Sequence, residues 1–247
     1  MQDMNALRFP FRLDEMIILR DAACEVVRSK GWLSHTPASF QRAVLERCRL
    51  EKFKAGTPIY SIGDKPRGMY GISAGCVSIS LVPAEQGPYT AHFSTPGNWF
   101  GEVSAFTRQP QRVGLTAARD TVLLHLPLRA FNEIVSKDPS AWRLFGLVTI
   151  GHLHTAMGGS DDLMIRNHVK RFVAILLRAG DCRHVSPQGR CPVEIDINHE
   201  DLAHMANVAR TTAGAILRKL EADGHLALAY RRISILAPDA LRTLLLD

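Results

Sequence analysis

The stretch DLAHMANVARTTAGAILRKLEADG (residues 201–224) predicts two short helices that meet at a tight turn around Asn207. Asn198 precedes the first helix, and Asp201 follows three residues later, an arrangement similar to the capping box that begins many helices. Asn also tolerates the left-handed conformation that a sharp turn demands. We therefore expect the first helix to end before Asn207 and the second to begin at Arg210.

The second of these helices has two faces of different chemistry. Its apolar face, which can pack into a core, carries Ala213, Ile216, Leu217 and Leu220. A helix that enters the major groove of DNA needs hydrogen-bond donors near its N-terminal end and small residues where its backbone approaches the bases. The chemistry of the opposite face therefore favours a helix that reads DNA. The alternative is an ordinary Ala-rich helical hairpin whose Arg side chains only face solvent. The candidate contact residues on the opposite face are Arg210, Thr211, Thr212, Gly214 and Arg218.

The sequence around the two helices predicts a larger C-terminal unit. Two short strands are expected near residues 226–230 and 233–236, and Arg231 and Arg232 lie at the turn between them. A basic turn there could reach a phosphate, like the wing of a winged helix. A further helix is predicted upstream, at about residues 168–179. We expect a DNA-binding domain over residues 168–247.

The N-terminal half has a different pattern of glycines and apolar residues. Glycines punctuate residues 51–136, and short apolar runs such as CVSISLV (76–82) and TVLLHLP (121–127) lie between them. Many short strands with Gly turns indicate a small antiparallel roll or barrel. Residues 14–50 show helical periodicity. We expect an α+β protein whose residues 1–136 form helices and a jelly-roll-like β-roll.

A long helix is predicted between these two parts, over residues 137–167. Asp138 and Pro139 suit its cap and first turn. Apolar residues then recur at helical spacing as far as Met164, although Gly158 and Gly159 interrupt them. A long helix after a roll often buries its apolar stripe against a partner, here a second copy of the chain. Packing on its own domain is the alternative.

Composition narrows the class of protein. No apolar run approaches the roughly 18–20 residues of a membrane helix, and charged residues near the N-terminus argue against a signal peptide, so a cytoplasmic location is expected. The 5 cysteines are widely spaced without a CxxC pair, which argues against a disulfide framework or a structural zinc site. The net charge of +6 permits an anionic partner without identifying it.

The order of these parts resembles the Crp/Fnr family of bacterial transcription regulators over about residues 35–240. In that family a cyclic-nucleotide-binding β-roll leads into a long dimerisation helix and a winged helix-turn-helix. The run ARTTAGAILRKLEADGHL (209–226) stands where the family typically has S-R-x-T-V-x-R-x-L-x-x-L-E-x-x-G-L-I. The resemblance implies a homodimer that reads a roughly palindromic site on double-stranded DNA and works with RNA polymerase.

Three positions of the DNA-binding run depart from the family pattern. Ala209 replaces the capping Ser, which typically costs ~1 kcal/mol of stability. Asn207 replaces the usual turn Gly, and Ala215 replaces a second recognition Arg. By resemblance, Arg210 and Thr211 are the base-edge readers. Loss of the second Arg implies an operator preference unlike that of the best-known members.

The run WFGEVSAFTRQPQRVGLTAA (99–118) resembles the family's phosphate-binding cassette, with Gly101-Glu102 and Arg112 at the cassette's separation. Arg can bind a cyclic phosphate with paired donors, Glu can accept a bond from a ribose hydroxyl, and backbone amides near Gly101 could form an anion nest. The candidate effector-binding residues are Gly101, Glu102, Arg112, Val113, Ala156 and Met157.

Two features of the candidate effector site concern the identity of the ligand. Val113 follows Arg112, where cAMP-responsive members have a small hydroxyl residue. Ala156 and Met157 align with the polar Thr-Ser pair that meets the base from the long helix. These departures favour another small effector, or none, over cAMP or cGMP.

Other functions find less support in the sequence. The two His residues of HEDLAH (199–204) are five apart and cannot share one metal on one helical face, and no catalytic motif marks an enzyme. The rival hypothesis is a cyclic-nucleotide or haem/redox sensor whose C-terminal domain acts through a protein partner. Candidate haem ligands are His92, His125 and Met157, and a metal or redox loop would use Cys182, His184 and Cys191.

Overall fold

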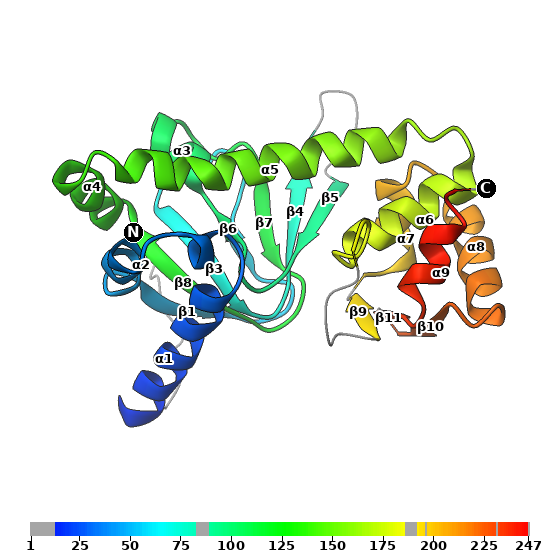
Figure 1. The fold of residues 1–247 in the computed structure, drawn as a ribbon, viewed down its shortest axis with the longest axis horizontal. Helices are drawn as coiled ribbons and strands as arrows, with labels where there is room; N and C mark the ends of the chain where they lie inside the picture. The colour runs from blue at the N-terminus through cyan, green and yellow to red at the C-terminus, as the bar shows by residue number, and fades with distance from the viewer. Residues whose placement is uncertain (1–12, 83–88, 186–191, 196, 231, 247) are drawn as a thin grey trace, which may run out of the picture.

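A long helix, α5 (Ala141–Leu163), joins an N-terminal β-roll to a C-terminal helical module (Figure 1). The computed structural model describes residues 13–82, 89–185, 192–195, 197–230 and 232–246. Antiparallel sheets and helices segregate along the chain, which confirms the predicted α+β class. No helix in these ranges is both long and apolar enough to cross a membrane.

The roll consists of two four-stranded antiparallel sheets. The first sheet has the order β1 (Arg49–Phe53), β8 (Thr121–Pro127), β3 (Gly68–Ala74) and β6 (Trp99–Phe100). The second has the order β2 (Pro58–Tyr60), β7 (Gly114–Ala117), β4 (Val77–Leu81) and β5 (Tyr89–Ser94). Apolar side chains from both sheets fill the space between them, so the roll predicted from the Gly-punctuated runs is confirmed.

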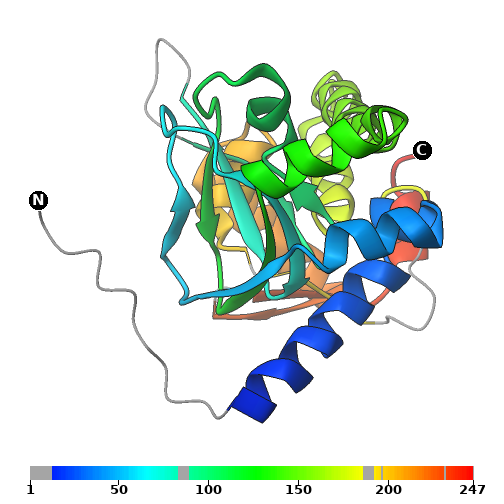
Figure 2. The same cartoon turned by 90° about the vertical axis from the view of Figure 1, so that its left-hand side faces the viewer.

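Helices flank one side of this roll (Figure 2). They are α1 (Leu13–Ser29), the short 3₁₀ helix η1 (Trp32–His35), α2 (Ala38–Leu45), α4 (Leu128–Lys137) and α5. A cluster of buried aromatic rings joins them, with Phe131 and Phe145 4.7 Å apart between ring centroids. The indole of Trp32 donates a 2.7 Å hydrogen bond to the carbonyl of Leu144, which ties η1 to the long helix.

Two boundaries in this half differ from the sequence prediction. The helical region expected as far as residue 50 ends earlier, because β1 begins at Arg49. Helices α3 (Glu102–Thr107) and α4 interrupt the region expected to hold only strands. For α4, every third or fourth residue is apolar, and Phe131, Ile134 and Val135 are buried against the roll.

The long helix begins at Ala141, two residues after Pro139, which the sequence placed in its first turn. Asp138 and Pro139 form a turn before it, in which the Asp138 carboxylate accepts a 3.0 Å bond from the Ser140 amide. The carboxylate therefore accepts a backbone hydrogen bond within this turn, and it does not cap the first turn of α5. The helix then continues through Gly158 and Gly159 to Leu163 without a break.

The C-terminal module combines helices with a three-stranded sheet. Its elements are α6 (His168–Ala179), β9 (Val193–Ile195), α7 (His199–Met205), α8 (Arg210–Ala222), β10 (Leu226–Ala229), β11 (Arg232–Ile235) and α9 (Pro238–Thr243). The sheet order is β10-β11-β9. Helix α6 and both strands of the wing are confirmed, but β9 was missed, since its three residues lie beside a predicted loop. One buried cluster includes this module together with Cys76 and Phe93 of the roll.

Candidate DNA-binding surface and effector cavity

Helix α8 turns one apolar face inward and one polar face outward. The four residues predicted to form its inner face are buried, namely Ala213, Ile216, Leu217 and Leu220. The side chains of Arg210, Thr211 and Arg218 are exposed, while Thr212 and Gly214 are half-buried. The helix therefore presents donors at its N-terminal end, beside a glycine where another backbone can approach closely.

The turn before α8 has the geometry predicted from the sequence. The side chain of Asn198 accepts a 2.7 Å bond from the amide of Asp201, which caps α7. Asn207 adopts the left-handed conformation with φ of 50°, and α8 begins at Arg210. Ala209 occupies the N-cap without a side-chain hydrogen bond, as expected from the absence of the capping hydroxyl.

Arg171 on α6 braces this turn, and sequence reasoning did not find it. Its Nε donates to the carbonyl of Ala206 at 2.8 Å, and its terminal nitrogens donate to the carbonyls of Ile165 at 2.9 Å and Asn207 at 3.2 Å. One guanidinium therefore satisfies backbone acceptors at the end of α7 and in the segment after α5. Nothing in the sequence distinguishes Arg171 from its neighbour Lys170, because its role depends on residues 35 positions away.

Two arginines on this surface form long ion pairs with glutamates. Arg210 lies 3.9 Å from Glu200, and Arg232 at the start of β11 lies 3.6 Å from Glu194. All four side chains are about half exposed or more, so water screens these pairs and their contribution to stability is small. Arg231 falls outside the described residues. Beside it at the wing turn, the side chain of Tyr230 is 92% exposed.

A cavity of about 1220 Å³ lies between the roll, α5 and the turn after α7. Its walls include five of the predicted effector residues: Gly101, Glu102, Arg112, Val113 and Ala156. Met157 is not among the lining residues, and its side chain is 57% exposed. Ala156 therefore faces the cavity, whereas Met157, about 100° further round α5, points away from it.

Gly101 supports the cassette through its backbone. It caps α3 with φ of 89°, and a Cβ at this position would lie 2.4 Å from the carbonyl oxygen of Gly68. Any side chain here would both clash and strain the backbone. Glycine at position 101 is therefore a requirement of the fold, independent of any ligand.

Glu102 already has a partner in this structure. Its side chain is 3% exposed, and its Oε1 lies 2.8 Å from Nδ1 of His152 on α5. The His152 ring stacks on Phe100, with ring centroids 5.3 Å apart. The carboxylate that the sequence assigned to a ribose hydroxyl thus joins the cassette to the long helix instead.

Comparison with known protein families identifies a domain in each of the two parts of the chain. The model of the cyclic nucleotide-binding domain matches residues 50–138, and that of the Crp-like helix-turn-helix domain matches residues 170–244. The chain is a member of the Crp/Fnr family of transcription regulators. The family is one of DNA-binding regulators, whose members are generally not enzymes.

Relatives of this Crp/Fnr protein match either most of the chain or about half of it. The cAMP-activated global transcriptional regulator CRP of Pasteurella multocida is 20% identical over 75% of this chain and 88% of its own length. A solved CRP-family transcriptional regulator of Thermus thermophilus has a TM-score of 0.63 at 23% identity, covering 80% of this chain and 97% of that one. The mouse hyperpolarization-activated cyclic nucleotide-gated channel 3 is 29% identical over 54% of this chain, which spans only 16% of the channel.

The candidate haem and metal ligands of this Crp/Fnr protein do not converge. His125 is held by Glu51 at 2.7 Å and by the carbonyl of Arg67 at 3.1 Å. His92 is half-buried in the cavity wall, where desolvation, and to a lesser degree the charges of His152 and Arg178, lower its pKa to about 4. Cys182 is buried, and Cys191 lies outside the described residues. Within the described ranges no three His, Cys, Asp or Glu side chains form a metal-binding group.

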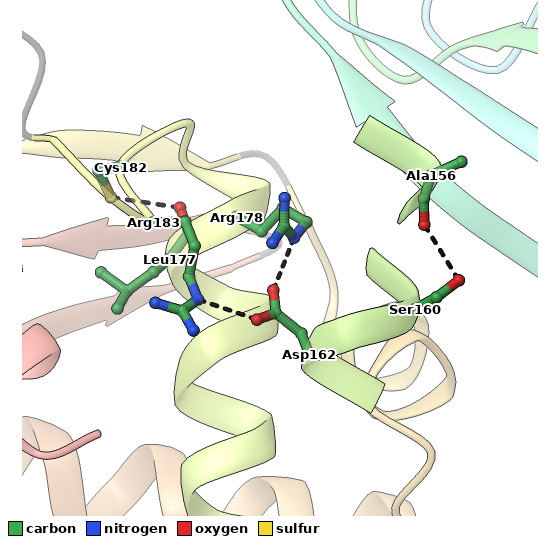
Figure 3. A network of polar contacts seen from close by, with 7 residues as sticks. All are labelled: Ala156, Ser160, Asp162, Leu177, Arg178, Cys182 and Arg183. Atoms are coloured by element: carbon green, nitrogen blue, oxygen red, sulfur yellow. Dashed lines mark hydrogen bonds and ion pairs between the residues drawn. The ribbon is translucent and has the colours of Figure 1, made fainter. Parts of the chain in front are cut away.

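A second ion-pair network joins α5 of this Crp/Fnr protein to its DNA-binding module (Figure 3). Asp162, with a side chain only 2% exposed, accepts from Nε of Arg178 at 2.6 Å and from Nε of Arg183 at 3.0 Å. The guanidinium of Arg178 also lies against Gly158, where a Cβ would approach it to 2.5 Å. The absence of a side chain at Gly158 therefore leaves room for the arginine that crosses between the two parts.

Proposed function

We propose that this transcription regulator binds a roughly palindromic operator as a homodimer, with residues 168–247 as its DNA-binding domain. The observation that carries the proposal is the exposed face of α8, where Arg210, Thr211 and Gly214 stand at the N-terminal end just after a left-handed turn. Two such helices would enter successive major grooves about 34 Å apart. For a regulator of this kind we expect a location in the bacterial cytoplasm, with RNA polymerase as a partner.

The dimer is supported by the outer face of α5. Leu147, Ile150, Met157 and Met164 are all more than 40% exposed. Their spacing of three and seven residues fits the heptad repeat with which a helix packs against a parallel copy of itself. We propose that residues 137–167 form the dimerisation helix and residues 1–136 the sensor domain.

The cavity is the proposed effector site, and it could influence DNA binding because both parts of the chain line it. Tyr60 and Arg112 come from the roll, Leu153 from α5, and Met205 and Val208 from the region of the turn before α8. A ligand that binds one arrangement of these parts more tightly would shift the population toward it. Selection from a randomised duplex pool at fixed salt, with and without cAMP, tests both the operator and the effector. A palindrome enriched in both arms shows operator binding without a requirement for cAMP, and enrichment of no sequence contradicts operator binding.

Replacing Arg210 by Ala should reduce sequence discrimination by about 1–3 kcal/mol at one base step of the operator. An arginine that bonds a base edge contributes to specific binding, whereas one that contacts only phosphate contributes to all sequences alike. The measurement is the dissociation constant for specific and random duplexes at one salt concentration. Arg129→Ala, at an exposed position on α4, is the matched control. Equal losses on both duplexes would assign Arg210 to a phosphate.

Gly214→Ala should weaken operator binding without harming the fold. A Cβ at this position would meet only the guanidinium of Arg218, at an ordinary contact distance of 3.5 Å. Replacing a helical Gly by Ala adds about 1 kcal/mol of helix propensity, so the free energy of unfolding should rise slightly. Gly146→Ala, which has open space around it on α5, should give a similar rise and leave operator affinity unchanged. Unchanged operator affinity in Gly214→Ala would mean that this face of α8 does not approach DNA closely.

A further inference from the structure

We infer that the effector of this regulator is an amphipathic anion, with one anionic group for Arg112 and an apolar body for the rest of the cavity, rather than a cyclic nucleotide. The inference rests on the proposed effector role of the cavity. It does not depend on the proposed operator, because ligand binding can be measured on the free protein.

A cyclic nucleotide does not fit the groups that line this cavity. Glu102, the acceptor available for a ribose hydroxyl, is buried and bonded to His152. Its Oε1 is already taken by His152, so a ribose hydroxyl could bond only to the other oxygen of a side chain that is 3% exposed. Val113 and Ala156 place aliphatic carbon at the two positions where hydroxyl groups would meet the phosphate and the base.

Several polar side chains in the walls are likewise engaged within the protein, although the buried hydroxyl of Thr149 has no partner. The hydroxyl of Ser104 donates to Gln111 at 2.8 Å. On α5, the hydroxyls of Thr155 and Ser160 each donate to a carbonyl of their own helix at 3.1 Å. The protons of these three hydroxyls are therefore already used and do not serve to specify a polar ligand such as a nucleobase.

Among the described residues that line the cavity, Arg112 is the cation that remains available to a ligand. Arg178 is committed to Asp162 at 2.6 Å, and His92 is neutral at physiological pH because burial and nearby positive charges lower its pKa to about 4. Arg112 lines the cavity and is exposed, and among the described residues no hydrogen bond or ion pair engages it. Its guanidinium can bind a carboxylate or phosphate oxygen pair with two parallel donors.

The remaining surface of the cavity is largely apolar and comes from both parts of the chain. The roll contributes Tyr60, Ile79 and Phe100, and the module contributes Ile175, Met205 and Val208. An apolar ligand body would remove this surface from water. Because Met205 and Val208 flank the turn before α8, such a ligand would contact the DNA-reading module directly. The affinity of the ligand would then depend on the position of this module relative to the roll.

Titration of the full-length protein with decanoate and 2-naphthoate tests the inference, with 1-decanol and cAMP as comparison ligands. We expect both carboxylates to bind with a stoichiometry of one per chain. The variant Arg112→Gln should weaken them by about 10-fold or more, the typical effect of losing a charged hydrogen bond, and should leave decanol binding unchanged. Arg129→Gln, on the far helix α4, should bind like the wild type.

Three results would overturn the inference. They are binding of cAMP in preference to both carboxylates, absence of carboxylate binding, and equal carboxylate binding to the wild type and Arg112→Gln. Operator binding is measured separately in the duplex selection. A protein that selects a palindrome but binds no carboxylate would therefore contradict the ligand class and leave the proposed DNA-binding function intact.

Discussion

Asp162→Ala should lower the free energy of unfolding by about 3 kcal/mol, near the lower end of the range for breaking a buried ion pair. Asp162 is almost fully buried and serves two arginines, Arg178 on α6 and Arg183 in the loop after it. Its removal would leave two guanidinium groups without their acceptor. Both arginines keep some contact with water, 16% and 22% of the side-chain area, which moderates the loss.

Urea unfolding of the full chain, followed by circular dichroism, measures this loss. Limited proteolysis between α5 and α6 should also accelerate, because Asp162 joins the end of α5 to the C-terminal module. A loss below about 0.5 kcal/mol, the usual range for surface substitutions, would mean that the network does not hold the two parts together.

Two adjacent glycines provide a matched test of the same network. Gly158→Ala would place a methyl group 2.5 Å from the guanidinium of Arg178 and push it away from Asp162. Gly159→Ala has open space around it and should gain about 1 kcal/mol from helix propensity. The first variant should therefore be less stable than the second. Equal stability would show that Arg178 can move aside without losing its ion pair.

The features predicted correctly from the sequence depend on residues close together along the chain. The Asn198 cap, the left-handed Asn207 and the start of α8 at Arg210 are all decided within a few positions. The alternation of buried and exposed faces on α8 follows from helical periodicity alone. Such signals can be recognised in a single sequence because the backbone geometry that they require is local.

The features that were missed arise from contacts between distant segments. Glu102 and His152 are 50 positions apart, and Arg171 reaches a turn 35 positions away. The cassette pattern correctly brought Gly101, Glu102 and Arg112 to one cavity, yet it could not show that α5 supplies a partner for the glutamate. Local reasoning also misplaced the start of α5, because Asp138 caps a turn instead of the helix.

Replacing Ile150 and Met157 together by Glu should convert the protein from a dimer to a monomer. Both side chains are about half exposed on α5, seven residues apart, and would repeat on the same face of a paired helix. Four carboxylates would then meet at a seam that needs apolar contacts, and like charges in a desolvated interface cost several kcal/mol. Sedimentation velocity measures the change, and Ile62→Glu, at an exposed apolar position in the roll, is the control.

The same double variant should lose about 10²–10⁴-fold in affinity for the full palindrome, the usual gain from linking two binding modules. Its affinity for an isolated half-site should stay the same, because α8 and its packing on α6 and α7 are unchanged. A variant that remains dimeric would show that the exposed stripe of α5 covers something other than a second copy. A monomer that keeps full affinity for the palindrome would instead show that the two modules bind their half-sites independently, and the role of α5 would then lie in sensing, since Leu153 and Ala156 of the same helix line the cavity.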